Sequence, residues 1–251
     1  MDDNERSLSK AEFKTYRRAT GQLIWLTEQT RPDLGFDSLE MSYHNRQAKI
    51  KHIKEANKNI KKAKQFESIV NFGKIGKYED LQILVYSDAS FANVEEKTRS
   101  VSGKLIFLSN KNEVDVSPIS WKSKTIAQVC KSAKAAETRS VDICTDDALF
   151  LARTVCELYT GRKGNAQIPV VVKCDSQALQ DSINSSKQVE EKIMRPVVQH
   201  IKDMVTREQI SHFDWVSTKE CLADLLTKKG AQCAETVLDI FKTGKNFLCQ
   251  K

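Results

Sequence analysis

The sequence lacks the features that mark membrane-spanning, secreted and zinc-binding proteins. Its 251 residues contain no apolar run near the about 18–20 residues that a membrane-spanning helix needs. The first ten residues are polar and acidic at their start, unlike a secretory signal. The seven cysteines never form a CxxC pair and the four histidines are dispersed, so neither a disulfide framework nor a zinc motif is expected. We therefore expect an intracellular protein with reduced thiols and no membrane partner.

The composition is that of a folded protein with a mild basic excess. Lys and Arg number 40 and Asp and Glu number 33, which gives a formal charge of +7. Hydrophobic residues make up 40% of the chain, enough for a packed core. The length allows one large domain or two small ones, and the charge permits a polyanionic partner without requiring one.

The first third of the chain is predicted to be helical. A helix is expected over residues 8–27 and a second one from near Asp33, after the turn at Pro32. Residues 46–64 form an amphipathic pattern whose outer face carries eight Lys and Arg residues against one acid, Glu55. That face is either simply solvated or follows a phosphate backbone. Under the second interpretation, the nucleic acid contacts on this helix are Lys54, Lys58, Lys61 and Lys62.

After Gly73 and Gly76 the pattern changes to strands and helices in alternation. Three short strands joined by turns indicate an antiparallel meander, and later strands separated by helices add parallel pairing. The predicted order is β-β-β-α-β-α-β-α, over residues 82–86, 103–109, 119–122, 133–159, 170–174, 189–207, 212–216 and from Leu222. This order predicts an α/β fold with helices packed on a mixed sheet, in which Trp121 and Trp215 are expected to be core residues.

Two acids follow predicted strands directly. Asp88 comes after the strand at 82–86, and Asp175 comes after the β-branched run at 170–174. If these strands are parallel neighbours, both carboxylates lie at the carboxyl end of the sheet, where open α/β sheets bind ligands. Each acid alone is equally compatible with a turn or a helix cap.

A third acid, Glu137, extends the apolar stripe of the long helix. It lies four residues before the first of the apolar positions, so its side chain is predicted to point from the core-facing side. The stripe consists of Val141, Cys144, Ala148, Leu151, Val155 and Leu158. Desolvating an unpaired carboxylate costs several kcal/mol, which favours a functional use over a chance placement. The alternative is a buried acid that pairs with Lys or Arg.

A fourth acid, Asp224, follows the last predicted strand and is expected to head the closing helix, where a capping role is the alternative. Four converging carboxylates repel one another and raise each other's pKa. Hard divalent cations with oxygen ligands relieve this repulsion, so the set predicts Mg²⁺ or Mn²⁺, two ions. Two such ions about 4 Å apart can hold the attacking water and the leaving oxygen of a phosphodiester.

Five motifs occur in an order and spacing that resemble a known family. They are YSDASFA at 86–92, PISWKSK at 118–124, AAET at 135–138, CDSQ at 174–177 and LADLLTKKG at 222–230. Together they resemble the ribonuclease H domain of copia-type LTR retrotransposon Pol polyproteins. GQLIWL at 21–26 and QTRPD at 29–33 resemble the segment that joins the reverse transcriptase to that domain.

The resemblance implies a ribonuclease H-like fold, a five-stranded mixed sheet flanked by helices, over residues 77–242. It implies a helical connection segment over 1–76, the C-terminal part of a reverse transcriptase, and a tail over 243–251. The implied reaction is metal-dependent hydrolysis of the RNA strand of an RNA–DNA hybrid. Asp88, Glu137, Asp175 and Asp224 are then both catalytic residues and metal ligands. Implied partners are the hybrid and the reverse-transcriptase portion of the polyprotein, in a cytoplasmic virus-like particle or in the nucleus.

Some features depart from the family or leave alternatives open. No Asp-Asp pair lies in a hairpin context, so polymerase activity is not expected of this chain. Lys122 and Lys124 are candidate phosphate contacts, although solvated charges on an edge strand are equally compatible. One alternative function is a catalytically idle nucleic-acid-binding module. Another is a nuclease of the same fold, an integrase or resolvase, that acts on DNA.

Overall fold

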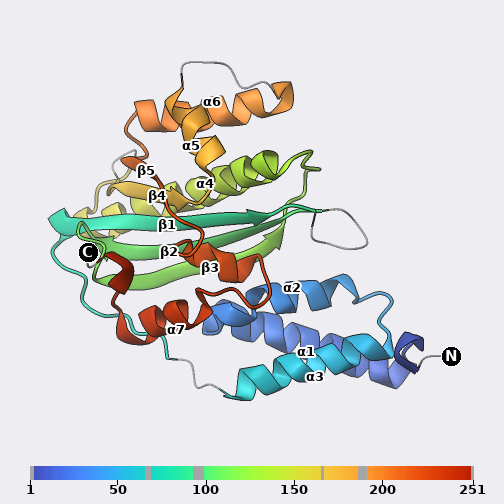
Figure 1. Ribbon diagram of the computed structural model, residues 1–251. Coiled ribbons are helices and arrows are strands. Elements are labelled where there is room, and N and C mark those ends of the chain that lie inside the picture. The colour runs from blue at the N-terminus through green and yellow to red at the C-terminus, as the bar shows by residue number, and fades with distance from the viewer. Residues whose placement is uncertain (1–2, 66–68, 93–98, 165–166, 186–190, 250–251) are drawn as a thin grey trace.

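Five strands form one mixed sheet at the centre of the computed structural model (Figure 1). The structure describes residues 3–65, 69–92, 99–164, 167–185 and 191–249. The strand order is β3-β2-β1-β4-β5, with antiparallel pairing among the first three strands and parallel pairing from β1 through β4 to β5. The strands are β1 Leu81–Ser90, β2 Val101–Asn110, β3 Val116–Thr125, β4 Val170–Cys174 and β5 His212–Trp215. The predicted five-stranded mixed sheet is confirmed.

The strand β1 is longer than the sequence pattern indicates. Its pairing with β2 continues to Ser90, and Asp88 lies opposite Gly103 within the ladder. The expectation that Asp88 follows the strand was therefore wrong. Polar residues at 87–90 resemble a turn in the sequence, but all of them are buried in the structure because other elements cover both faces of β1.

Helices α4 (Ala133–Thr160), α5 (Gln177–Asn184) and α6 (Arg195–Thr206) cover one face of the sheet (Figure 1). The helix predicted over 133–159 is confirmed as α4. The helix predicted over 189–207 begins only at Arg195, after a 3-10 turn, and residues 189–190 of that prediction lie outside the described residues. Helix α5 was not predicted, since eight residues carry little periodicity.

The apolar stripe of α4 holds over its first half and fails at its end. Val141, Cys144 and Ala148 are fully buried, whereas Leu158 is 79% exposed. A stripe with alternating spacings of three and four residues repeats every 3.5 residues, and an α-helix turns every 3.6, so the stripe drifts around the helix. Ala152 and Cys156 are the buried positions near the end of α4.

The opposite face is covered by a five-residue 3-10 helix, η5 (Leu222–Leu226), and by α7 (Ala234–Thr243). The closing α-helix thus begins at Ala234 and not near Leu222. Below this layer lie α1 (Lys10–Gln29), α2 (Gly35–Tyr43) and α3 (Ile50–Gln65), as Figure 1 shows. These three helices share an apolar core made of Tyr16, Leu23, Leu34, Met41, Ala48 and Ala56.

The helical segment lies directly against the sheet region. The indole Nε1 of Trp121, on β3, donates to the carbonyl oxygen of Thr27 at 2.7 Å. The hydroxyls of Tyr43 and Thr125 are 2.8 Å apart. A methyl group at Gly35 would approach the Leu226 side chain to 2.8 Å, so α2 packs closely on η5. The division of the chain at residues 76 and 242 stays a prediction.

The two tryptophans expected in the core differ in their surroundings. Trp121 is half-buried and packs edge-on against Phe241, with ring centroids 4.9 Å apart. Trp215 is 45% exposed, so the expectation of a core position was wrong. It lies on β5, which is the edge strand of the sheet and has one neighbouring strand. Among the described helices, none combines the length and apolar character that a membrane crossing requires.

Candidate active site

Asp88 provides the most buried carboxylate of the site, with 1% of the residue exposed. Its even position in β1 places the side chain on the same face as Leu84 and Tyr86, toward η5. There it accepts a hydrogen bond from the hydroxyl of Thr227, and the Lys228 ammonium lies 3.9 Å from its Oδ2. The residue after η5 therefore fixes the orientation of a carboxylate that is 139 positions earlier in the chain.

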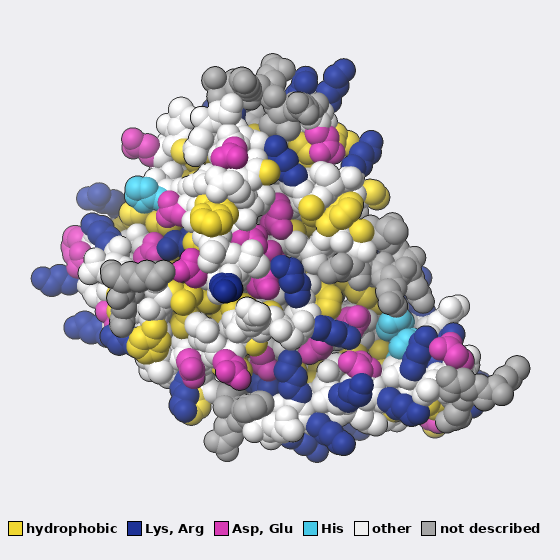
Figure 2. Space-filling view, in the orientation of Figure 1, with side chains coloured by type: hydrophobic (Ala, Val, Ile, Leu, Met, Phe, Trp, Pro, Cys, Tyr) yellow, Lys and Arg dark blue, Asp and Glu magenta, His cyan; other side chains and the backbone are white. Residues whose placement is uncertain are grey.

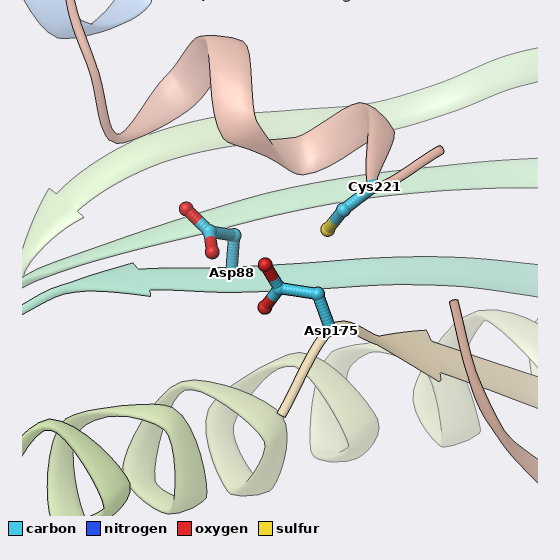
Figure 3. A group of neighbouring side chains, drawn as sticks. All are labelled: Asp88, Asp175 and Cys221. Carbon is cyan, nitrogen blue, oxygen red and sulfur yellow. The ribbon is translucent and has the colours of Figure 1, made fainter. Parts of the chain in front are cut away.

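Asp175 lies next to Asp88 because their strands are parallel neighbours. Ser87 pairs with Cys174, so the following residues leave the two strands side by side. Figure 3 shows the carboxylates of Asp88 and Asp175 pointing toward one another. The Thr218 hydroxyl donates to Asp175 Oδ2 at 2.9 Å. The predicted juxtaposition at the carboxyl end of the sheet is confirmed.

Cys221 is a third group at this position, and sequence reasoning did not include it. Its Sγ and one carboxylate oxygen each of Asp88 and Asp175 all lie within 4.8 Å of one another (Figure 3). The thiol is buried and donates to the carbonyl oxygen of Ser87 at 3.6 Å. Burial and the neighbouring carboxylates raise the pKa of the Cys221 thiol. No motif marks this cysteine; only its position three residues before Asp224 is a signal.

Glu137 reaches the site from the first turns of α4. One oxygen, Oε1, accepts a hydrogen bond from the Ala89 backbone at 3.3 Å. The other, Oε2, is buried and has no hydrogen-bond partner among the residues that the structure describes. Burial first, and then the charges of Asp88 and Asp175, raise the pKa of Glu137 to about 9. The expected core-facing direction is confirmed, and no Lys or Arg in the described part of the chain forms an ion pair with Glu137.

Asp224 lies within η5, as part of a 3-10 helix, and does not head an α-helix as expected. Its Oδ1 forms an ion pair with Lys228 four residues later. The charges of Asp224 and Asp175 both act on Asp88. Burial is the largest cause that raises the pKa of Asp88 to about 6, against opposing effects of Lys228 and Thr227.

The residues present fit a hard divalent cation. Four acids from β1, α4, the end of β4 and η5 interact electrostatically, and no described residue donates to the buried Oε2 of Glu137. A buried polar atom without a partner is costly, and oxygen ligands of this kind are those that Mg²⁺ and Mn²⁺ prefer. Asp88, Asp175, Glu137 and Asp224 would hold such ions, whereas the Cys221 thiol is a soft group beside them.

The basic residues singled out in the sequence do not gather at the carboxylates. On α3, Lys54 contacts Asn4, Lys58 pairs with Glu55, and Lys62 pairs with Asp37 at 3.2 Å. Lys61 is exposed. Figure 2 shows Lys and Arg side chains along the lower part of the molecule, where the N-terminal helices lie.

The basic residues of β3 are also exposed. Lys122 pairs with Glu28 of α1 at 3.2 Å, and Lys124 lies further along the strand. Lys124 lines a cavity of about 470 Å³ together with Lys104 and Asp147. Whether these lysines contact nucleic acid stays a prediction.

Comparison with known proteins gives one sequence relative and several structural likenesses. No family model matches the chain. It is 28% identical over 162 residues to the "Retrovirus-related Pol polyprotein from transposon RE1" of Arabidopsis thaliana, over 64% of this chain and 10% of that protein. The chain thus spans about a tenth of the length of that relative. The match confirms the resemblance that the five motifs carry.

Two solved ribonuclease H structures align with about three fifths of the chain. The N-terminal ribonuclease H domain of rv2228c from Mycobacterium tuberculosis has 13% identity and a TM-score of 0.41, over 62% of this chain and 98% of that one. LC11-RNase H1, isolated from compost, has 13% identity and a TM-score of 0.43, over 61% and 98%.

Proposed function

We propose that this chain, which is similar to a retrotransposon Pol polyprotein, is a metal-dependent hydrolase that cleaves the RNA strand of RNA–DNA hybrids. The observation that carries the proposal is that the Asp88 and Asp175 carboxylates lie together and act electrostatically on Glu137, whose buried Oε2 has no hydrogen-bond partner among the described residues. A fold that gained only stability from these acids would pair them. The reverse-transcriptase portion of a polyprotein is the proposed partner.

Asp88, Asp175, Glu137 and Asp224 would hold the two cations, and Glu137 would also help to position the attacking water. When bound, the cations lower the pKa of the water and neutralise charge that develops on the phosphodiester. The water attacks phosphorus and the bridging P–O bond breaks, without a covalent enzyme intermediate. The carboxylates of Asp88, Asp175, Glu137 and Asp224 would supply the oxygen ligands for this chemistry.

The neighbouring hydroxyls keep the carboxylates in place. Thr227 donates to Asp88, and Thr218 donates to Asp175 at 2.9 Å. Behind them, the Ser140 hydroxyl donates to the backbone oxygen of Asp88 at 2.8 Å and so ties α4 to β1. Such supporting hydrogen bonds hold ligands within the small tolerance that catalysis requires.

The substrate would be recognised through its sugar hydroxyls and hybrid shape, not through base sequence. The acidic site itself repels a phosphate backbone, so cations must mediate the contact with the scissile phosphate. Lys122 and Lys124 on β3 and the exposed lysines of α3 are proposed contacts with the duplex backbone.

The test is cleavage of an end-labelled RNA–DNA hybrid with Mg²⁺, with Mn²⁺ and with a chelator. We expect cleavage only with a divalent cation, and a loss of at least about 10³-fold in both Asp88→Asn and Asp175→Asn. Circular dichroism confirms that the variants remain folded. Equal turnover by wild type and both variants would falsify the proposal.

Two further measurements separate the alternative functions: cleavage of duplex DNA, and binding of the hybrid by wild type and by the variants that lack the acids. A catalytically idle module would bind the hybrid at the same affinity with and without the acids and cleave nothing. A DNA nuclease of this fold would cleave duplex DNA at least as fast as the hybrid. The proposed hydrolase cleaves the hybrid and leaves duplex DNA intact.

A further inference from the structure

Lys228 places a positive charge among the carboxylates that are proposed to hold the cations. Its ammonium pairs with Asp224 Oδ1 and lies 3.9 Å from Asp88 Oδ2. The side chain comes from the residue that follows Thr227, just beyond η5, and is 40% exposed. One lysine thus contacts two of the four acids while it keeps a route to solvent.

A divalent cation and an ammonium compete for the same oxygens. Asp224 Oδ1 accepts a hydrogen bond from the Lys228 ammonium. Like charges about 4 Å apart repel by about 1 kcal/mol even in water and by several times more in a partly buried site. A cation bound between Asp88 and Asp224 therefore displaces the ammonium. The exposure of Lys228 allows this displacement without a change in the backbone.

The next residue, Lys229, differs from Lys228 in its contacts. It forms ion pairs with Glu40 of α2 and, at 3.5 Å, with Glu55 of α3. Both lysines are similarly exposed, at 40% and 44% of the side chain. Lys229 therefore serves as a matched control. It carries the same charge and is the adjacent residue, but its ion pairs are with Glu40 and Glu55 and not with the four acids.

We propose that Lys228 is an internal competitor of the divalent cation. The lysine neutralises Asp88 and Asp224 until a cation displaces its ammonium, and this competition sets the metal affinity of the site. This inference rests on the proposed function, because it takes the four acids as metal ligands. It assigns to Lys228 a positioning and affinity-setting role, not a direct part in phosphodiester cleavage. Without metal, the positive charge of Lys228 reduces the repulsion between the carboxylates of Asp88 and Asp224. The same charge weakens the binding of a cation.

The test is calorimetric titration of Mn²⁺ into wild type, Lys228→Met and Lys229→Met at one fixed pH, without nucleic acid. We expect Lys228→Met to bind Mn²⁺ about tenfold more tightly than wild type, and Lys229→Met to stay within about twofold. Without metal, Lys228→Met melts at a lower temperature than wild type, and Mn²⁺ raises its melting temperature by more. Lys228→Arg retains the charge and is expected to bind Mn²⁺ as wild type does.

Equal or weaker Mn²⁺ binding by Lys228→Met overturns the role of Lys228 and leaves the proposed function intact. If wild type and Lys228→Met both fail to bind Mn²⁺, the proposed function itself fails. If Lys228→Met does not fold, Lys228→Gln is titrated instead, since it retains the length of the stem and a hydrogen-bond donor. Unchanged affinity in Lys228→Gln also overturns the proposal.

Discussion

Buried charge is handled in opposite ways in the helical segment and at the carboxyl end of the sheet. In the segment, Arg31 is 1% exposed and forms a two-pronged ion pair with Asp33, at 2.7 and 2.8 Å. The same guanidinium also donates to the carbonyl oxygens of Ala63 and Lys62. Both carboxylate oxygens of Asp33 thus accept hydrogen bonds from Arg31. The Arg31 guanidinium also bonds to the end of α3 and so fixes this helix on the turn before α2.

At the sheet, the buried acids outnumber their partners. Asp88 and Asp224 share one lysine, and Glu137 retains a buried oxygen to which no group in the described ranges donates. The pKa of Glu137 rises to about 9 and that of Asp88 to about 6. The comparison teaches that a buried charge that stabilises the fold is fully paired, whereas unpaired buried carboxylates indicate a ligand site. Four changes test this difference.

Loss of Arg31 should have the largest effect on stability. Arg31→Met leaves the Asp33 carboxylate buried without its main partner, which costs about 3–5 kcal/mol of unfolding free energy. Urea unfolding measures the change. The double variant Arg31→Met with Asp33→Leu removes both charges and is expected to recover a large part of the loss. A single variant as stable as wild type would contradict a structural role of the pair.

A methyl group at Gly103 should disturb the acidic site in particular. Its Cβ would lie 2.7 Å from Thr227 Cγ2 and 2.8 Å from the Ala223 carbonyl oxygen, so η5 must move away from Asp88. We expect Gly103→Ala to cost about 1–3 kcal/mol and to reduce hybrid cleavage more than it reduces stability. The control is Gly21→Ala in α1, where no atom lies within 4 Å of the added carbon. That exposed helical position should gain about 0.5–1 kcal/mol, and a loss at both positions would refute the argument.

The pH dependence of stability should reveal the unpaired acids. A folded-state pKa above the ordinary value of 4.5 means that folding favours the protonated form of Glu137. In chelator, the stability that this group confers is present below about pH 4.5 and is lost as the pH rises toward 9. Glu137→Gln mimics the protonated form and should remove this part of the decline.

Melting temperatures at pH 5, 7 and 9 in chelator measure the effect, with an expected difference of roughly 5 °C between wild type and Glu137→Gln at pH 9. Asp33→Asn serves as the contrast. The Asp33 carboxylate is paired with Arg31, so this substitution should lower the melting temperature. Parallel curves for wild type and Glu137→Gln would show that Glu137 is ionised without cost.

The basic face of α3 should contribute the smallest effect. Of the four α3 lysines proposed as contacts, Lys58 and Lys61 are exposed and form no hydrogen bond or ion pair with another described element, whereas Lys62 binds Asp37 and the carbonyl oxygen of Asp33. Replacement of Lys58 and Lys61 by Ala should weaken hybrid binding severalfold and lower the salt slope by about two. The charge-matched control is the double variant Arg162→Ala with Lys163→Ala. These residues follow the C-terminal end of α4, whereas Glu137 lies near its N-terminal end. An unchanged slope would remove α3 from the binding surface.

Sequence patterns predicted the elements whose residues share one environment along their length. The run at 170–174 has buried valines on both faces and is strand β4 to the residue, and the helix predicted over 133–159 is α4. The patterns were less informative where contacts with residues distant in sequence determine the length of an element or the burial of a side chain. Asp88 is inside a strand because β2 pairs with it, and Trp215 is exposed because β5 is an edge strand.

The sequence by itself determined that four acids stand in ordered motifs, on a chain with the strand and helix order of an α/β fold. Only the tertiary structure decided that a thiol lies beside two of them and that Lys228 rather than Lys229 faces the acids. It also decided that one Glu137 oxygen is buried away from every donor of the described residues. The physical reason is distance along the chain. Local sequence sets helix and strand periodicity, whereas burial, pairing and repulsion of charges depend on groups that folding brings together from more than 130 positions apart.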